Sequence, residues 1–231
     1  MKSRSAERWT RLVPLSLVLA VVAFNAVALL PEVSEPVPSV NDDALHYLFI
    51  QRASAALSAG QNPLDFWVPQ IDLGIPQFLY YQHLPHLVVV VLYWLLFKRV
   101  QLLTLFNLVR YVLLVGFPFT VYWSMRLMEF SPIAAAVAAA GASLLSADYH
   151  YGFEYESYVW YGFGMYTQLW AMHLSFLVLA FFWRLLTRAD SYLSATLAFS
   201  ALVLSHLFYA YMMAVMALVL YFFSLRREFR S

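Results

Sequence analysis

The 231-residue sequence contains no cysteine, and charged residues make up only 12% of it. Without cysteine the chain can form neither a disulfide framework nor a thiolate metal site. A soluble domain carries about twice that share of charge, so an ordinary water-soluble fold is not expected. The chain also lacks a GxxxxGK[ST] phosphate loop, a GxGxxG fingerprint and the HExxH and GxSxG motifs of hydrolases. Its basic residues are scattered, so no nucleic-acid partner is expected.

Hydrophobic residues are what the chain has in excess, at 63% of the total and a mean hydropathy of +0.68. Several apolar runs approach or exceed the ~20 residues that a helix needs to cross a bilayer. The runs are 12–30, 84–97, 102–127, 133–145, 166–186 and 193–225. The last run is long enough for two spans, with a turn expected near Ser205, His206 and Tyr211. The sequence therefore predicts an all-α, polytopic helical membrane protein.

The distribution of charge predicts which side of the membrane each segment faces. The run 12–30 follows a basic start, which indicates an uncleaved first span with a cytoplasmic N-terminus. Residues 31–83 then carry six acids and one base, as is typical of an outer loop. The segment 148–168 has three acids and no Lys or Arg, so it is expected outside as well. A prokaryotic inner or plasma membrane is the expected location.

Three apolar runs separate these two outer segments, although an even number of spans must connect them. We favour a juxtamembrane, non-spanning role for 84–97, because it is short and follows two prolines. The run 102–127 then crosses inward as one span, and the chain has about six spans in total. The alternative keeps Lys98 and Arg99 inside and breaks 102–127 into a hairpin near Gly116 and Pro118.

A helix lying on the membrane surface is predicted within the first outer loop, over residues 42–60. Its expected apolar face consists of Leu45, Leu48, Phe49, Ala53, Ala56 and Leu57. Gly60 is a suitable C-cap, with Pro63 just beyond it. The whole chain, 1–231, is expected to form a single transmembrane module. Its parts are the first span (12–30), the outer loop with the surface helix and juxtamembrane segment (31–100), and the remaining spans (101–225).

Two adjacent carboxylates, Asp42 and Asp43, begin the predicted surface helix, and His46 follows on the next turn. Acids are favoured in the first turn of a helix, so an ordinary capping role would explain them. Alternatively, they hold a divalent cation such as Mg²⁺ or Mn²⁺, or one of them acts as a general base. Asp42 is the favoured candidate, because His46 four residues later shares its helix face.

The segment 148–168 is a second candidate site, because acids and histidine lie there among many aromatic residues. The ionisable residues are Asp148, His150, Glu154 and Glu156. Aromatic belts are normal at bilayer interfaces, which explains part of this composition. The same composition also suits sugar binding, since ring faces stack on sugar C–H groups while acids accept hydroxyl protons.

Ionisable residues inside apolar runs form a third set of candidates, among them Arg110, His173 and His206. Charges at membrane depth are costly and indicate function by default. Arg110 could bind a lipid phosphate, a task that its planar fork suits. The other interpretation of Arg110 is snorkelling or pairing with an outer-loop acid. For His173 a role in helix packing is favoured. For His206 a role in helix packing and a functional role both stay open.

The segments DDALHYLFIQRASAALSAG and WVPQIDLGIPQFLYYQHLPH, together with LSH at 204–206, resemble a known group of membrane proteins. The layout resembles the N-terminal module of the GT-C superfamily of membrane glycosyltransferases, which use polyprenyl-phosphate-linked sugars. More narrowly, it resembles a branch called 6-pyruvoyl-tetrahydropterin-synthase-related membrane proteins. The resemblance covers roughly residues 10–225.

The resemblance implies transfer of a sugar from a polyprenyl-phosphate donor in the bilayer to an acceptor on the outer face. The residues implied by the resemblance are Asp42 or Asp43 as catalytic acid, Asp148, Glu154 or Glu156 as second acidic motif, and Arg110 and His206 for the lipid phosphate. His46 and His150, which lie near the two acidic motifs in the sequence, are expected to support them. GT-C enzymes are much longer, so a fragment, a module or an inactive relative is expected. The alternative is a non-enzymatic transporter module or assembly subunit of envelope glycan synthesis. The interruption at Gly116 and Pro118 favours a transporter.

Overall fold

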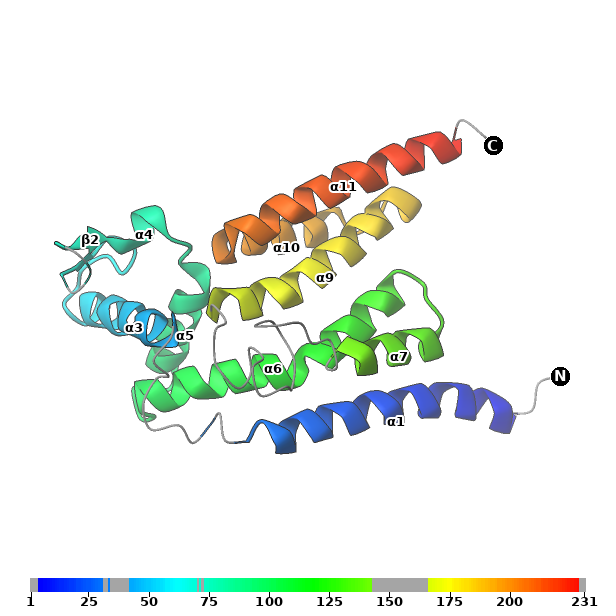
Figure 1. Cartoon of the computed structure of the whole chain (residues 1–231), viewed down its shortest axis with the longest axis horizontal. Helices are drawn as coiled ribbons and strands as arrows, with labels where there is room; N and C mark the ends of the chain where they lie inside the picture. The colour runs from blue at the N-terminus through cyan, green and yellow to red at the C-terminus, as the bar shows by residue number, and fades with distance from the viewer. Residues whose placement is uncertain are drawn as a thin grey trace. The chain divides into compact units, whose positions relative to one another are not determined.

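The computed structural model describes residues 4–30, 33, 42–69, 71, 73–142 and 166–228. The helices in this part of the chain are α1 (Arg4–Ala28), α3 (Asp42–Ser58), α4 (Gln77–Tyr80), α5 (Leu84–Leu95), α6 (Leu102–Leu127), α7 (Pro132–Ala142), α9 (Tyr166–Arg188), α10 (Tyr192–Ser205) and α11 (Leu207–Glu228). Two short strands, β1 (Trp67–Val68) and β2 (Ile75–Pro76), pair antiparallel. Nearly all regular structure is helical (Figure 1), which confirms the predicted all-α class.

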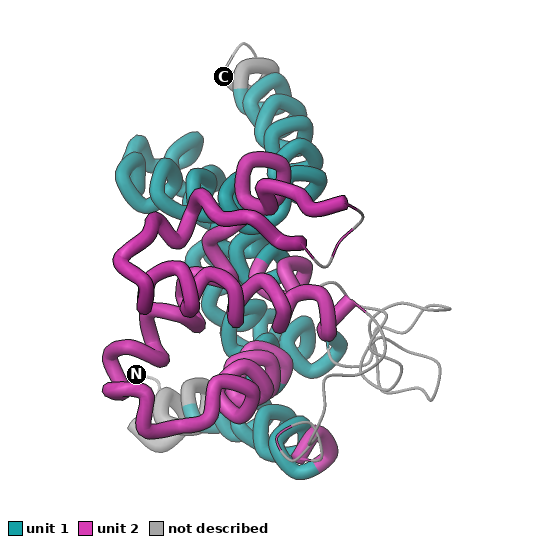
Figure 2. Tube along the Cα trace, turned by 90° about the vertical axis from the view of Figure 1, so that its left-hand side faces the viewer, with its two compact units in different colours: residues 1–27, 115–145, 171–231 teal, residues 28–114, 146–170 magenta. Residues whose placement is uncertain are grey.

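The chain divides into two compact units (Figure 2). Unit 1 consists of residues 1–27, 115–145 and 171–231, and unit 2 of residues 28–114 and 146–170. The boundary falls inside α6 and inside α9, so each of these helices begins in unit 2 and ends in unit 1. Each unit has its own buried apolar cluster: Phe49, Ile50, Val89, Val90 and Phe106 are among those in unit 2, and Ala171, Val178 and Leu202 among those in unit 1.

Three helices are long and apolar enough to cross a bilayer, which fits an integral membrane protein. They are α6, α9 and residues 207–224 of α11. The apolar parts of α1, α5, α7 and α10 are shorter than this within the described residues. The predicted number of six spans is therefore not confirmed, and the described residues contain three candidate spans.

Helix α6 continues without a break through Gly116 and Pro118. A proline inside a helix removes one backbone hydrogen bond, but helices in membranes tolerate this. The alternative topology, with a hairpin at this point, is therefore wrong. Gly116 and Pro118, which favoured a transporter in the sequence, do not break the helix. Helix α5 has only 12 residues, a length of about 18 Å. That is well short of the ~30 Å of a bilayer core, as the non-spanning role of 84–97 requires.

Helix α3 begins and ends close to where the sequence predicts. Gly60 follows its last turn with φ +72°, which glycine adopts without strain. The N–H groups of Gly60 and Gln61 bond to the carbonyls of Leu57 and Ala56 at 3.1 and 2.9 Å. These two bonds form a Schellman motif, which satisfies carbonyls that the helix end would otherwise leave without partners.

The buried face of α3 includes polar residues that the apolar pattern did not predict. Phe49, Ala53 and Ala56 are buried as expected, but Leu45 is 38% exposed. Asp43 and His46 take the buried position instead, where α3 packs against α5. The prediction was wrong here because it assigned the helix face from apolar residues alone.

The long final run breaks at His206, as predicted. The backbone of His206 is extended at φ −162°, and its N–H bonds to the Leu202 carbonyl at 2.8 Å at the end of α10. Its carbonyl accepts a bond from the Ala210 N–H at 3.1 Å in the first turn of α11. The two helices then pack against each other within unit 1.

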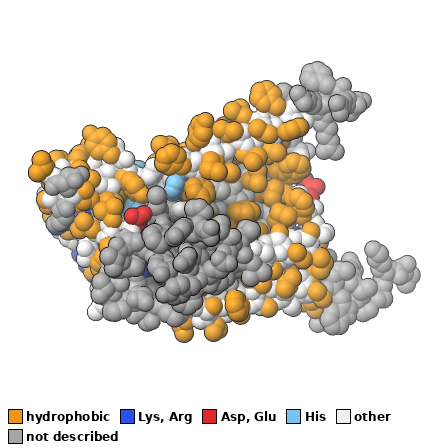
Figure 3. All heavy atoms as spheres, viewed as in Figure 1, with side chains coloured by type: hydrophobic (Ala, Val, Ile, Leu, Met, Phe, Trp, Pro, Cys, Tyr) orange, Lys and Arg blue, Asp and Glu red, His pale blue; other side chains and the backbone are white. Residues whose placement is uncertain are grey.

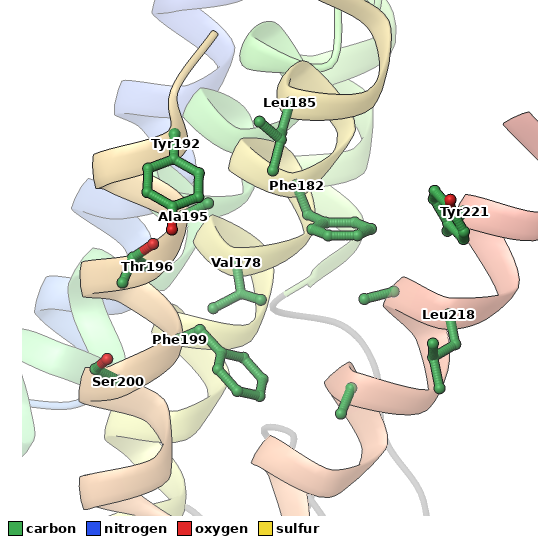
Figure 4. A pocket seen from close by; sticks show the side chains of 12 residues that line it. Val178, Phe182, Leu185, Tyr192, Ala195, Thr196, Phe199, Ser200, Leu218 and Tyr221 are labelled. Carbon is green, nitrogen blue, oxygen red and sulfur yellow. The ribbon is translucent and has the colours of Figure 1, made fainter. Parts of the chain in front are cut away.

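An apolar groove of about 550 Å³ lies among α9, α10 and α11 in unit 1. Phe182 of α9, Phe199 of α10 and Leu218 of α11 are among the side chains that line it (Figure 4). Elsewhere on α11 most large apolar side chains are exposed, including Phe208 and Phe222. Hydrophobic side chains accordingly cover much of the visible surface over this helix (Figure 3). A helix that exposes apolar side chains in this way suits contact with lipid rather than with water.

Candidate functional site

A buried ion pair joins the start of α3 to α6 within unit 2. Nη2 of Arg110 lies 2.9 Å from Oδ2 of Asp43, and the two side chains are only 9% and 2% exposed. The Nη1 of Arg110 also donates to Oδ1 of Asn107, one turn earlier on α6, at 3.5 Å. A buried charge requires such partners, because removing it from water is otherwise very unfavourable. Arg110 thus pairs with Asp43, and its binding of a lipid phosphate stays a prediction.

Two buried histidines face each other across the packing of α3 and α5. Nδ1 of His46 lies 3.0 Å from Nε2 of His86. One ring must donate an N–H and the other must accept it, so both rings cannot be protonated while this bond persists. Burial lowers the pKa of His86 well below 6.5, and the neighbouring His46 lowers it further. His86 is therefore neutral at physiological pH.

Aromatic side chains surround this histidine pair. The ring of His46 lies 5.9 Å from that of Tyr81 and 5.7 Å from that of Tyr166, measured between centroids. The Tyr166 hydroxyl donates to the carbonyl of Pro85 at 3.0 Å, which connects α9 to the start of α5. Burial raises the pKa of Tyr81, a hydrogen bond with Thr167 lowers it in part, and the charge of Asp42 raises it again. His46, His86 and Tyr166 are thus buried among aromatic rings, and Tyr81 beside them is half-buried.

Asp42 is the exposed member of the carboxylate pair. Asp43 rather than Asp42 is buried on the same face of α3 as His46, so the expected grouping of Asp42 with His46 is corrected. The reason is that the helix turns its Asp43 and His46 side toward α5 and α6, which leaves Asp42 toward the outside. The start of α3 therefore has one exposed carboxylate, Asp42, next to Asp43, whose carboxylate is fixed by the guanidinium of Arg110.

The other predicted site residues fall elsewhere. Arg110 belongs to unit 2, where it pairs with Asp43, and His206 belongs to unit 1. His206 is buried at the break between α10 and α11, where its ring lies 4.9 Å from that of Tyr209. His173 packs between helices, with Nδ1 at 2.7 Å from Oγ1 of Thr120. The remaining candidates, Asp148, His150, Glu154 and Glu156, lie outside the described residues.

A divalent cation at Asp42 and Asp43 finds little further support in the site. Within the ranges that the structure describes, no group of three or more His, Asp or Glu side chains is placed to hold a metal ion. Asp43 already shares its carboxylate with Arg110. Any cation bound here would therefore rest mainly on Asp42.

His86 and Tyr166 were not predicted as members of the cluster. A local signal exists for His86, which lies on the same helix face as the buried Val89 and Val90, three and four residues later. No local signal could have shown that this face meets His46, because the two histidines are 40 residues apart in the chain. Tyr166 opens a candidate span, where an interfacial tyrosine is the ordinary expectation.

The chain matches no known protein family, no curated protein and no solved structure. The site is therefore interpreted from its own contacts. A fixed carboxylate, an exposed carboxylate, a guanidinium and a hydrogen-bonded histidine pair can move protons and bind anionic or hydroxyl groups.

Proposed function

We propose that the chain is a membrane glycosyltransferase-like protein. It moves a sugar from a polyprenyl-phosphate donor to an acceptor at the outer face of the membrane. The observation that carries this proposal is the start of α3, where Asp42 is exposed and Asp43 is fixed to the buried Arg110 at 2.9 Å. Because Arg110 belongs to the candidate span α6, this pair ties the carboxylates to a membrane helix.

The proposed reaction needs both kinds of charge. The acceptor oxygen forms a bond to the anomeric carbon while the bond from that carbon to the donor phosphate breaks. The phosphate leaves with the bonding electrons, and the acceptor hydroxyl loses its proton to a base. Asp42 is the carboxylate that takes this proton, and the guanidinium of Arg110 stabilises the charge of the leaving phosphate.

The direct test is Asp42→Asn, because Asp42 is exposed and its charge is not part of the buried ion pair. Membranes that contain the protein are given a fluorescent polyprenyl-phosphate sugar, and transfer to acceptors in the same membranes is measured. Removing a general base lowers the rate by about 10²- to 10⁴-fold. Asp190→Asn is the matched control, since Asp190 belongs to unit 1 and lies outside this site.

Asp43 needs a different variant, because replacing it alone leaves Arg110 buried without its carboxylate. The double variant Asp43→Asn with Arg110→Gln removes both charges together and leaves no unpaired ion. A folded double variant without transfer activity supports a role of the pair in the reaction. Full transfer in both Asp42→Asn and the double variant, at normal protein levels, contradicts the proposal and favours a non-enzymatic membrane protein.

A further inference from the structure

A second, more open cavity lies in unit 2, at the end of α3. Its volume is about 710 Å³, within the ~300–1,000 Å³ range of small-molecule sites. Its side chains come from the last turns of α3 and from the segment that leads into β1. Those that carry the argument are Arg52, Gln61, Asn62, Asp65, Phe66 and Trp67.

The polar side chains of this cavity have hydrogen-bonding capacity left over. Among the described residues, neither the Arg52 nor the Asp65 side chain forms a hydrogen bond or an ion pair, although both line the same cavity. The amide oxygen of Asn62 accepts the N–H of Leu64 at 3.0 Å, which fixes the direction of that side chain. The cavity therefore offers guanidinium donors, carboxylate acceptors and amides that do both.

The aromatic side of the cavity is held in place despite its exposure. Trp67 is 57% exposed, yet its indole lies directly against the backbone of Gly74 in the hairpin. A Cβ at Gly74 would lie 2.1 Å from Nε1 of Trp67, and its φ is +97°, so only glycine fits. Phe66 packs edge-on against Phe78, with 5.0 Å between ring centroids. An exposed tryptophan whose indole is held in place by neighbouring backbone can serve as a stacking surface.

The polar side chains and aromatic rings that line the cavity together indicate the class of ligand. A purely apolar ligand would bury Arg52 and Asp65 without partners, which is strongly unfavourable. An anion would be repelled by Asp65, and a cation by Arg52. A neutral molecule whose groups both donate and accept hydrogen bonds satisfies all four polar side chains. If it also has an apolar face, it gains contact with the aromatic rings.

We propose that this cavity is a binding site for a neutral pyranose sugar. Vicinal hydroxyls bond to Asp65, Asn62 and Arg52, and a C–H face of the ring stacks on Trp67. The site requires no transfer reaction, so it is independent of the proposed function: a sugar can bind here in an inactive protein. Conversely, transfer at Asp42 can occur without this site.

The test uses the full chain in nanodiscs, because glycoside detergents would themselves occupy a sugar site. The probes are the methyl pyranosides of glucose, galactose and mannose, and N-acetylglucosamine. Binding is detected by saturation-transfer NMR, which observes sugar C–H protons in contact with the protein. At least one of these sugars is expected to bind, with its strongest signals from one face of the ring.

Matched variants assign the binding to this cavity. Asp65→Asn and Trp67→Ala are expected to weaken it by about tenfold or more, since each removes a principal contact. Trp67→Phe keeps an aromatic surface and should retain most of the binding. Asp190→Asn and Leu79→Ala change an acid and an exposed leucine outside the cavity and should have no effect.

Three results would overturn the proposal. The first is that no sugar of the panel gives a signal with folded protein. The second is that binding persists unchanged in Asp65→Asn and in Trp67→Ala. The third is that the sugars do not bind, whereas phosphoethanolamine, which carries both a positive and a negative charge, binds and requires Arg52 and Asp65. The cavity would then recognise a ligand by its opposite charges.

Discussion

Ion pairs in the two units of this chain differ in almost every physical respect. In unit 2, Asp43 and Arg110 are 2% and 9% exposed and join two helices. In unit 1, Arg184 and Asp190 are 28% and 40% exposed, and Arg188 and Glu129 are both 52% exposed. Water and salt screen the unit 1 pairs, so they contribute little to stability. The unit 2 pair is buried, and an unpaired charge there would be very unfavourable. Asp43 and Arg110 are therefore expected to keep their contact.

The two kinds of ion pair constrain the fold to different degrees. Arg184 reaches only six residues along the chain to Asp190, with Nε at 2.9 Å from Oδ1, at the turn between α9 and α10. Such a contact follows from local sequence and would form in many folds. Asp43 and Arg110 meet only if α3 and α6 pack in one particular way. The buried pair is therefore expected to select that packing.

The largest effect expected from one substitution is that of Asp43→Asn. It leaves Arg110 buried without its carboxylate, which lowers the free energy of unfolding by about 3–5 kcal/mol. Thermal or denaturant unfolding of the protein in detergent micelles measures this change. The double variant Asp43→Asn with Arg110→Gln should recover most of the loss, because no unpaired charge remains. If the single and double variants are equally unstable, the contrast between buried and exposed pairs does not hold.

A second prediction concerns the buried histidines. The folded pKa of His86 lies below the value of about 6.5 in an unfolded chain, so the unfolded state binds more protons in acid. The stability is fully present above about pH 6.5 and falls below it, by up to about 1.4 kcal/mol per pH unit, until the folded pKa is reached. Unfolding of wild type and His86→Gln between about pH 8 and about pH 5 measures this slope. Equal slopes in the two proteins would contradict the prediction.

Local features of the helices were predictable from the sequence, whereas contacts between distant segments were not. The bounds of α6 were predictable, because a long apolar run with polar flanks is a local signal. The capping of α3 by Gly60 was predictable for the same reason. The orientation of α3 was not, because Asp43 is buried only in the presence of Arg110, far away in the chain. His46 and His86 likewise become a pair only through the packing of α3 on α5.

A buried but uncharged contact separates the effect of burial from that of charge. Tyr166→Phe removes the hydroxyl that donates to the Pro85 carbonyl at 3.0 Å and leaves the aromatic ring in place. The expected loss is about 0.5–1.5 kcal/mol, the usual net contribution of a neutral hydrogen bond. Unfolding of this variant under the conditions used for Asp43→Asn measures it. A loss as large as that of Asp43→Asn would mean that burial alone, and not charge, sets the difference between the units.

The smallest effect is expected at the exposed pair of unit 1. The hydrogen bond from Arg184, a second one from Ser191 and the nearby positive charges hold the pKa of Asp190 at about 2, below its ordinary 3.8. A depressed pKa means that this carboxylate stabilises the fold above about pH 3.8 and that the contribution disappears as the pH falls through about 2. Because both partners are exposed, Asp190→Asn should shift the melting temperature at neutral pH much less than Asp43→Asn does. The shift should shrink further in concentrated salt and toward about pH 2. A shift that is large and insensitive to salt would show that this pair, too, is shielded from water, and would remove the distinction between the two units.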